Sequence, residues 1–166
     1  DILNQGSSVV CFCRYVEVCQ DYLPDSIACE TIFTYAGDDS DKNIADFRES
    51  AKKRPSVLFS SDKGRESLNL PEAQYVINVD VPWGQAELTQ RIHRIRRVDS
   101  ENQNVYAIQM VVPGFEEYKF HLSKWKGDVA SYVIDGEQEQ TEKRSLREFL
   151  ENFNKKKTFH ESTLGV

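Results

Sequence analysis

The sequence predicts an α/β fold in which helices cover both faces of a mainly parallel central sheet. Short apolar runs recur along the chain, and most are continuous rather than alternating with polar residues, as is typical of strands buried on both faces. Helical patterns separate these runs, and this alternation favours parallel strands joined by crossover helices. The 166 residues, 39% of them hydrophobic and 29% charged, suffice for one domain with a core.

Five strands are predicted, and each ends at a polar or turn residue. They cover residues 9–13, 31–35, 56–59, 75–79 and 105–112. Ligands of open parallel sheets bind beyond the carboxyl ends of the strands. The residues that follow the strands are therefore candidate site residues, namely Arg14, Gly37, Ser60, Ser61 and Asp80.

Helical patterns fall between and after these strands. They cover residues 15–23, which stop at Pro24, and residues 41–53, 85–98 and 116–133. In the second of these helices Ile44, Phe47 and Ala51 share one face, and Ser40 or Asp41 supplies the N-cap.

A polar linker at residues 135–140 leads to a last predicted helix at residues 144–157. Its apolar stripe comprises Leu146, Phe149, Leu150 and Phe153, and this stripe docks either on its own domain or on a partner. We therefore expect one domain at residues 1–135, with a linker and a helical extension at residues 136–166. Because the chain opens at Asp1 without an initiator methionine, we expect it to be a fragment of a longer protein.

The most informative stretch is residues 90–97, which hold four arginines and no acid. On a continuous helix Gln90, Arg94 and Arg97 share one face, while Leu88, Ile92 and Ile95 occupy the opposite face. Guanidinium groups stay charged and fit phosphate oxygens. This pattern favours a site for a polyanion, and the alternative is a solvated basic face.

The remaining composition narrows the class of protein. The formal net charge is −6, so any nucleic-acid contact should use a local basic patch rather than the whole surface. The four cysteines form no CxxC pair and the three histidines are scattered, which predicts no metal site and buried free thiols in a reducing cell interior. We see no signal peptide and no membrane-spanning run.

Taken together, three segments in this order resemble the second RecA-like lobe of superfamily 2 helicases and translocases, most closely the Snf2-type branch. Residues 60–70 resemble the family's motif V, residues 80–83 its D-x-x-W stretch, and residues 90–97 its QRxxRxxR motif VI. Further similarity lies at residues 8–14, at residues 35–47, and at residues 114–117 with Lys124.

The resemblance implies a RecA-like three-layer sandwich with added C-terminal helices. It also implies that ATP binds in a cleft between two lobes, where arginines of the second lobe stabilise the transferring phosphoryl group. Matched residue by residue, the candidates are Arg94 and Arg97 for catalysis, Gln90, Arg91, Gly64 and Asn69 for ATP binding, and Arg14, Gly37, Ser60 and Ser61 for nucleic-acid binding.

The chain contains neither a G-x-x-x-x-G-K-[ST] phosphate loop nor a D-E-x-H-like box. We therefore expect ATP and Mg²⁺ to be bound mainly by an N-terminal RecA-like lobe, and this chain alone to be inactive. The expected partners are that lobe and nucleic acid, DNA rather than RNA, with no membrane. The expected location is the cytoplasm or nucleoid, or the nucleus in a eukaryote.

Several alternatives stay open. Ser67 and residues 99–100 replace glycines and a glutamine of the family pattern, so a non-catalytic RecA-like module that binds nucleic acid or protein is the second hypothesis. A third makes the arginine helix a protein-docking face. For single residues, Arg91 could pair with Glu87, the two serines could cap a helix, and Asn69 could be a turn residue.

Overall fold

The computed structural model describes residues 2–36, 40–62, 68–98, 100, 102 and 104–135. The linker and the helix expected at residues 136–166 lie outside the described residues. The division of the chain at residue 135 therefore stays a prediction.

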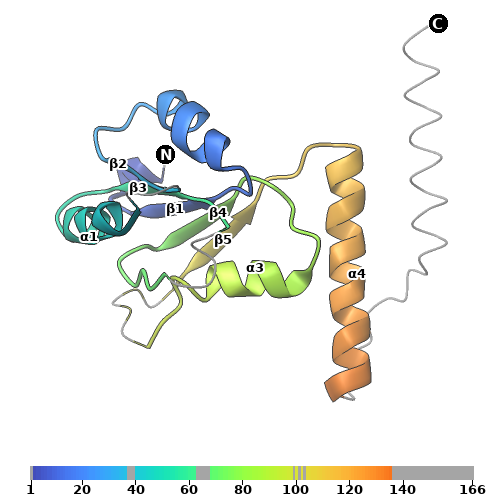
Figure 1. Cartoon of the computed structure of the whole chain (residues 1–166). Coiled ribbons are helices and arrows are strands. Elements are labelled where there is room, and N and C mark those ends of the chain that lie inside the picture. Colours follow the sequence, from blue (N-terminus) through green and yellow to red (C-terminus); the bar gives the residue numbers. More distant parts are fainter. Residues whose placement is uncertain are drawn as a thin grey trace, which may run out of the picture.

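A five-stranded, all-parallel sheet forms the centre of the domain (Figure 1). Its strands are β1 (Val9–Phe12), β2 (Ile32–Tyr35), β3 (Val57–Ser60), β4 (Tyr75–Asn78) and β5 (Tyr106–Gln109). They lie in the order β2-β3-β1-β4-β5, and Val9 of the central strand is in register with Val57 and Tyr75. The predicted α/β class and all five strands are confirmed; four strands are shorter than predicted, and β3 has the predicted length but is shifted by one residue.

Successive side chains of β1 point to opposite faces of the sheet and enter two separate cores. Val10 and Phe12 pack on one face, where Phe47 of α1 (Ser40–Ala51) covers them. Val9 and Cys11 pack on the other, under the segment that carries the fully buried Cys19. The two cores give the domain three layers.

The segment on this second face departs from regular α-helix. It forms the π-helical turn η2 (Val18–Tyr22) and then the 3₁₀ turn η3 (Pro24–Ser26), and a further 3₁₀ turn, η1 (Leu3–Gln5), precedes β1. Pro24 lacks an amide hydrogen, so it suits the first position of a turn. The helix predicted at residues 15–23 is thus a helical segment of different type.

Helix α3 (Gln85–Ile92) is shorter than the predicted 85–98, and that prediction is wrong at its carboxyl end. The amides of Arg94 and Ile95 donate three residues back, to the carbonyls of Arg91 and Ile92 at 3.2 and 3.1 Å, which tightens the last turn. The Arg94 carbonyl accepts from the Leu70 amide at 2.8 Å. Arg94 and Arg97 therefore lie beyond α3, and the turn that follows the helix also holds a bond from the Arg96 amide to the Ile92 carbonyl at 3.0 Å.

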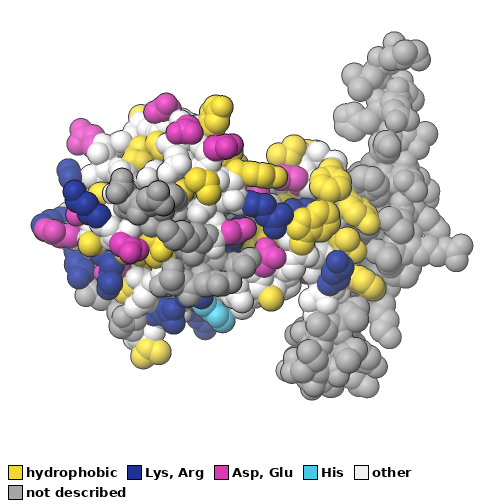
Figure 2. Space-filling model, viewed as in Figure 1, with side chains coloured by type: hydrophobic (Ala, Val, Ile, Leu, Met, Phe, Trp, Pro, Cys, Tyr) yellow, Lys and Arg dark blue, Asp and Glu magenta, His cyan; other side chains and the backbone are white. Residues whose placement is uncertain are grey.

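The open edge of the sheet is more exposed than the sequence predicts. The run at 105–112 was expected to be a buried strand, yet Tyr106 and Ile108 of β5 are 47% and 39% exposed. The physical reason is cover, because α1 and η2 pack against β2, the other edge strand, whereas the packing neighbour of β5 is β4. Apolar side chains gather where this edge meets the next helix (Figure 2); they include Trp83, Met110, Val112 and Phe115.

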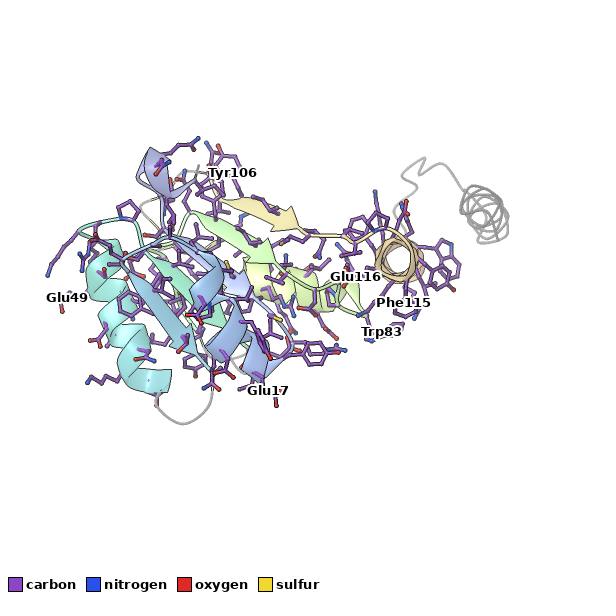
Figure 3. The ribbon with its side chains drawn as sticks, turned by 90° about the horizontal axis from the view of Figure 1, so that it is seen from above. Glu17, Glu49, Trp83, Tyr106, Phe115 and Glu116 are labelled. Carbon is purple, nitrogen blue, oxygen red and sulfur yellow. The ribbon has the colours of Figure 1, made fainter. Side chains whose placement is uncertain are left out.

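Helix α4 (Phe115–Asp135) follows Gly114, whose φ of 104° lies in the left-handed region that favours glycine. Phe115 and Trp83 lie beside one another near its start, with ring centroids 6.2 Å apart (Figure 3). Farther along, α4 passes close to α3, since a Cβ on Gly127 would lie 3.0 Å from the Cβ of Gln85. Among the described residues, no helix combines the length and apolar character that crossing a bilayer requires.

Candidate functional site at the carboxyl edge of the sheet

Because all five strands are parallel, their carboxyl ends meet along one edge of the sheet. The chain leaves β1 toward β2 on one side and leaves β4 toward β5 on the other. Open α/β sheets bind ligands at such a point, where neighbouring connections diverge. Arg14 follows β1 at this point and Asp80 follows β4.

Arg91 of α3 is fully buried, with 0% of its surface exposed. Its Nη2 donates to Asp62 Oδ1 at 2.8 Å and lies 3.6 Å from Asp80 Oδ1, while Nη1 donates to Asn78 Oδ1 at 3.2 Å. The guanidinium also stacks over the Phe12 ring at 5.5 Å. A buried cation needs such counter-charges, so the charge of Arg91 is committed to its own domain.

Arg14 completes this cluster from the other side. Its backbone amide donates to Asp80 Oδ1 at 3.0 Å, and its guanidinium lies 3.6 Å from Asp62 and 3.8 Å from Glu87. Arg14 and Arg91 thus share Asp62, and Glu87, considered above as a partner of Arg91, approaches Arg14. We call Arg14, Asp62, Asp80, Glu87 and Arg91 the edge network.

The arginines beyond α3 differ in how they are held. Arg94 is half-buried, and its Nη1 donates to the Leu68 carbonyl at 3.3 Å. Together with the bond between Leu70 and the Arg94 carbonyl, this joins the chain after α3 to residues 68–70. Arg97 and Gln90 are exposed. Catalysis by Arg94 and Arg97 and ATP binding by Gln90 and Arg91 stay predictions.

The other candidate residues contribute less to this edge. Ser60 and Ser61 are buried, and their hydroxyls donate to the carbonyls of Ser61 and Tyr35 at 3.1 and 3.4 Å. Asn69 is exposed between buried leucines. Gly37 and Gly64 lie outside the described residues. Nucleic-acid contact by the serines and by Arg14, and ATP contact by Asn69, stay predictions.

The acidic residues of the edge network do not form a metal site. Asp62, Asp80 and Glu87 each lie within 4 Å of an arginine nitrogen, and the described part of the chain holds no group of three or more His, Cys, Asp or Glu suited to a metal ion. Carboxylates whose charge is already matched by guanidinium are poor ligands for Mg²⁺. This donor set does not fit Mg²⁺.

A pair of thiols adjoins the edge network. Cys19 Sγ donates to the Cys13 carbonyl at 3.6 Å. The pKa of Cys13 is lowered to about 7, mainly by a side-chain hydrogen bond with Cys19. The same bond, with burial, raises the pKa of Cys19, and burial raises the pKa of Cys11 to about 12. Sequence patterns gave no sign of this pair or of Asp62, although Asp62 directly follows the predicted strand-end serines.

This architecture, an all-parallel three-layer domain with a buried, ion-paired arginine of α3 at the carboxyl edge, is that of a RecA-like lobe. Residues 1–99 match the model of the helicase conserved C-terminal domain. The chain belongs to the helicase conserved C-terminal domain family.

Two relatives illustrate the match. The chain is 42% identical, over 45 residues, to the uncharacterized ATP-dependent helicase YqhH of Bacillus subtilis (strain 168). That match covers 27% of this chain and 8% of the helicase. The fold is similar to the crystal structure of the C-terminal part of the Fun30 ATPase domain, with a TM-score of 0.63 and 23% identity, over 74% of this chain and 41% of that one.

Proposed function

We propose that this chain is the C-terminal motor lobe of an ATP-dependent nucleic-acid helicase or translocase of Snf2-like type. In this proposal Arg94 and Arg97 act on ATP that is bound between this lobe and an N-terminal lobe. The observation that carries it is the arginine segment that follows α3, which is joined to residues 68–70 by the bond between the Leu70 amide and the Arg94 carbonyl at 2.8 Å. Gln90 and Asn69, both exposed, would contact the nucleotide there.

The contacts of the arginines support different roles for Arg91 on the one hand and for Arg94 and Arg97 on the other. Arg91 is fully buried and ion-paired, so it holds α3 against the sheet. Arg97 is exposed and has no such constraint on reaching a phosphate. Arg94 lies between these extremes, with its backbone fixed to Leu70. An arginine on a fixed backbone can meet a phosphoryl group with little reorganisation.

The nucleotide phosphates and Mg²⁺ would be held by the N-terminal lobe. The carboxylates of the edge network are matched by arginines, as described above, and the sequence has no phosphate loop. This lobe alone would then hydrolyse ATP poorly. Activity would depend on the two lobes closing around the nucleotide.

Nucleic acid would lie across the carboxyl edge of the sheet, where the side chain of Arg14 is 34% exposed. Contact of a guanidinium with backbone phosphate positions a strand without reading its sequence. We expect DNA to be the track, and parallel titrations with DNA and RNA of the same sequence test this choice.

The deciding experiment measures nucleic-acid-stimulated ATP hydrolysis by the two-lobed protein that contains this chain. Arg94→Ala and Arg97→Ala should each lower the turnover number by about three orders of magnitude or more, the loss typical of an arginine finger. Arg96→Ala is the matched control, because Arg96 is exposed in the same segment. Near-wild-type turnover in both test variants would reject the assignment.

A non-catalytic module that binds nucleic acid or protein is the second candidate. The observation that favours it is the paired state of the edge network, in which both Arg14 and Arg91 already have carboxylate partners. This candidate predicts binding without hydrolysis in the two-lobed protein. On this candidate the wild-type protein would have no ATPase activity, and Arg94→Ala would bind nucleic acid or protein as tightly as the wild type does.

A further inference from the structure

The end of β1 and the η2 turn bring two thiols together on one face of the sheet. Cys13 directly follows β1 and Cys19 belongs to η2, and they are 3% and 0% exposed. Cys19 Sγ lies 3.6 Å from the Cys13 carbonyl oxygen, and the two thiols share a side-chain hydrogen bond. The function proposed above uses neither thiol.

Backbone hydrogen bonds hold this pair of thiols in place. The Cys13 amide donates to the Ser60 carbonyl at 3.0 Å, which ties it to the end of β3. The Cys19 amide donates to the Tyr15 carbonyl at 3.2 Å, so the chain turns back toward β1. Two sulfurs in hydrogen-bonding contact need only a short movement to reach the length of a disulfide bond, about 2.05 Å. The position of the two thiols therefore suits a bridge between β1 and η2.

The two thiols differ in reactivity. The pKa of Cys13 is lowered to about 7, mainly by the hydrogen bond with Cys19; burial and Asp80 oppose this effect, while the Tyr15 backbone and Arg91 assist it. The thiolate is the nucleophilic form of cysteine, so Cys13 suits the attacking role. The pKa of Cys19 is raised, mainly by the same hydrogen bond. Oxidation of Cys13 would remove that bond and make Cys19 a better nucleophile in turn.

We propose that Cys13 and Cys19 form an oxidation site that reacts with a hydroperoxide and closes to a disulfide. The Cys13 sulfur attacks the terminal oxygen of the hydroperoxide; an S–O bond forms, the O–O bond breaks, and the departing oxygen takes up a proton. The Cys19 sulfur then attacks the sulfenic acid on Cys13; the S–S bond forms, and the hydroxyl leaves as water with the proton of Cys19. The two sulfurs lose two electrons and the hydroperoxide gains them.

The oxidant would reach the pair through the segment that covers it. Tyr15 and Tyr22 of this segment are 62% and 71% exposed, so little of their surface holds the segment to the sheet. Segments with few buried contacts open locally without global unfolding. The bridge would close residues 13–19 into a loop that contains Arg14. This inference stands apart from the proposed function, because its tests require no ATP hydrolysis.

Cys11 is a matched control for Cys13. It lies two residues earlier on β1, so its side chain points to the same face of the sheet, and it is equally buried, at 4% exposed. Burial raises the pKa of Cys11 to about 12, so it stays a thiol at neutral pH. A difference in oxidation between the two residues would therefore reflect thiolate character rather than access.

The first measurement treats the two-lobed wild-type protein with hydrogen peroxide at neutral pH. The remaining thiols are then blocked with iodoacetamide, and the peptides are mapped by mass spectrometry without reductant. A Cys13–Cys19 link that dithiothreitol reverses should form, and Cys13 should be oxidised at least about tenfold faster than Cys11. Absence of the link, or equal oxidation of Cys13 and Cys11, would overturn the inference. The result does not depend on whether a variant folds.

The second measurement separates the two chemical steps. Cys19→Ser keeps a hydroxyl that can donate to Cys13 but removes the sulfur that closes the bridge. Dimedone, which reacts with sulfenic acids, should label Cys13 at least about tenfold more in Cys19→Ser than in the wild type. Cys11→Ser should form the Cys13–Cys19 link as the wild type does. Equal labelling in Cys19→Ser and the wild type would contradict the role assigned to Cys19.

Discussion

Arg91 and Asp62 are 29 residues apart in the sequence, yet their side chains meet at 2.8 Å at the carboxyl edge of the sheet. The contact joins the end of β3 to α3. Arg91 is buried completely, so its positive charge depends on Asp62 and Asp80 rather than on water. Two segments that resemble separate helicase motifs are thereby held as one unit.

This relationship predicts that Arg91 is essential for stability as well as for any activity. Arg91→Ala removes the buried cation that Asp62 and Asp80 share and should lower the free energy of unfolding by about 3–5 kcal/mol. Urea denaturation measures this loss. Arg96→Ala, at an exposed site, should change the free energy of unfolding by no more than about 0.5 kcal/mol, and equal losses in the two variants would contradict the role of burial.

The packing of α1 gives a second prediction. Phe47 is 0% exposed and meets Phe33 edge to face, with ring centroids 6.0 Å apart. Phe47→Ala should lower the free energy of unfolding by about 3–5 kcal/mol, through lost burial and the cavity left behind. Val98→Ala changes a fully exposed side chain and is the control. A small effect of Phe47→Ala in urea denaturation would show that α1 does not close this core.

The thiol pair predicts an unusual titration. Because the Cys19 thiol hydrogen-bonds to it, Cys13 should form a thiolate near pH 7, where its pKa has been lowered. Ultraviolet absorbance of the thiolate follows this step. Cys19→Ala removes the donor and should raise the pKa of Cys13 toward the ordinary value of 9.0. An unchanged pKa in this variant would show that the Cys19 hydrogen bond is not the cause of the low value.

The same pKa sets the sign of a stability change with pH. The folded pKa of Cys13 lies below the unfolded value, so its contribution is present above pH 9 and is lost as pH falls toward 7. The free energy of unfolding should therefore rise between pH 7 and 9 more steeply in the wild type than in Cys13→Ser. For Cys11, whose folded pKa is raised to about 12, stability should instead be lost as pH rises above 9.

Arg14 predicts a specific effect on the salt dependence of nucleic-acid binding. If its partly exposed guanidinium contacts one phosphate, Arg14→Ala should reduce the slope of log affinity against log salt by about one. Fluorescence titrations of the two-lobed protein at several salt concentrations measure this slope. Arg54→Ala, which alters a cation just before β3 at the opposite edge of the sheet, should leave the slope unchanged.

The sequence predicted the sheet well because its central strands are buried on both faces and so carry continuous apolar runs. It failed at β5, since burial depends on which helices pack over a strand, and periodicity does not encode this: α1 and η2 pack against β2, whereas the packing neighbour of β5 is β4. It also extended α3 to residue 98, because the spacing of Leu88, Ile92 and Ile95 fits a helix. The bond from Leu70 to the Arg94 carbonyl, a tertiary contact, helps to end that helix earlier.

The candidate site was predicted in part for a similar reason. Strand ends and arginine spacing identified Arg14, Asp80 and Arg91, because local pattern and fold class are enough to place them. The role of Asp62 depends on which strand neighbours which, and the partners of Cys13 and Cys19 depend on the π-helical turn. Such pairings arise only when distant segments fold together.

Gly127 lies close to Gln85 of α3, so a residue outside the region matched to the family contacts the helix that carries Arg91. The matched region ends at residue 99, whereas Gly127 belongs to α4 and, having no side chain, lets that helix come close to the first turn of α3. A side chain at position 127 would place its Cβ 3.0 and 3.1 Å from the Cβ and Cγ of Gln85, so Gln85 would have to shift by a few tenths of an ångström. A mutational survey confined to the shared motifs would therefore overlook position 127, which contacts α3 from outside those motifs.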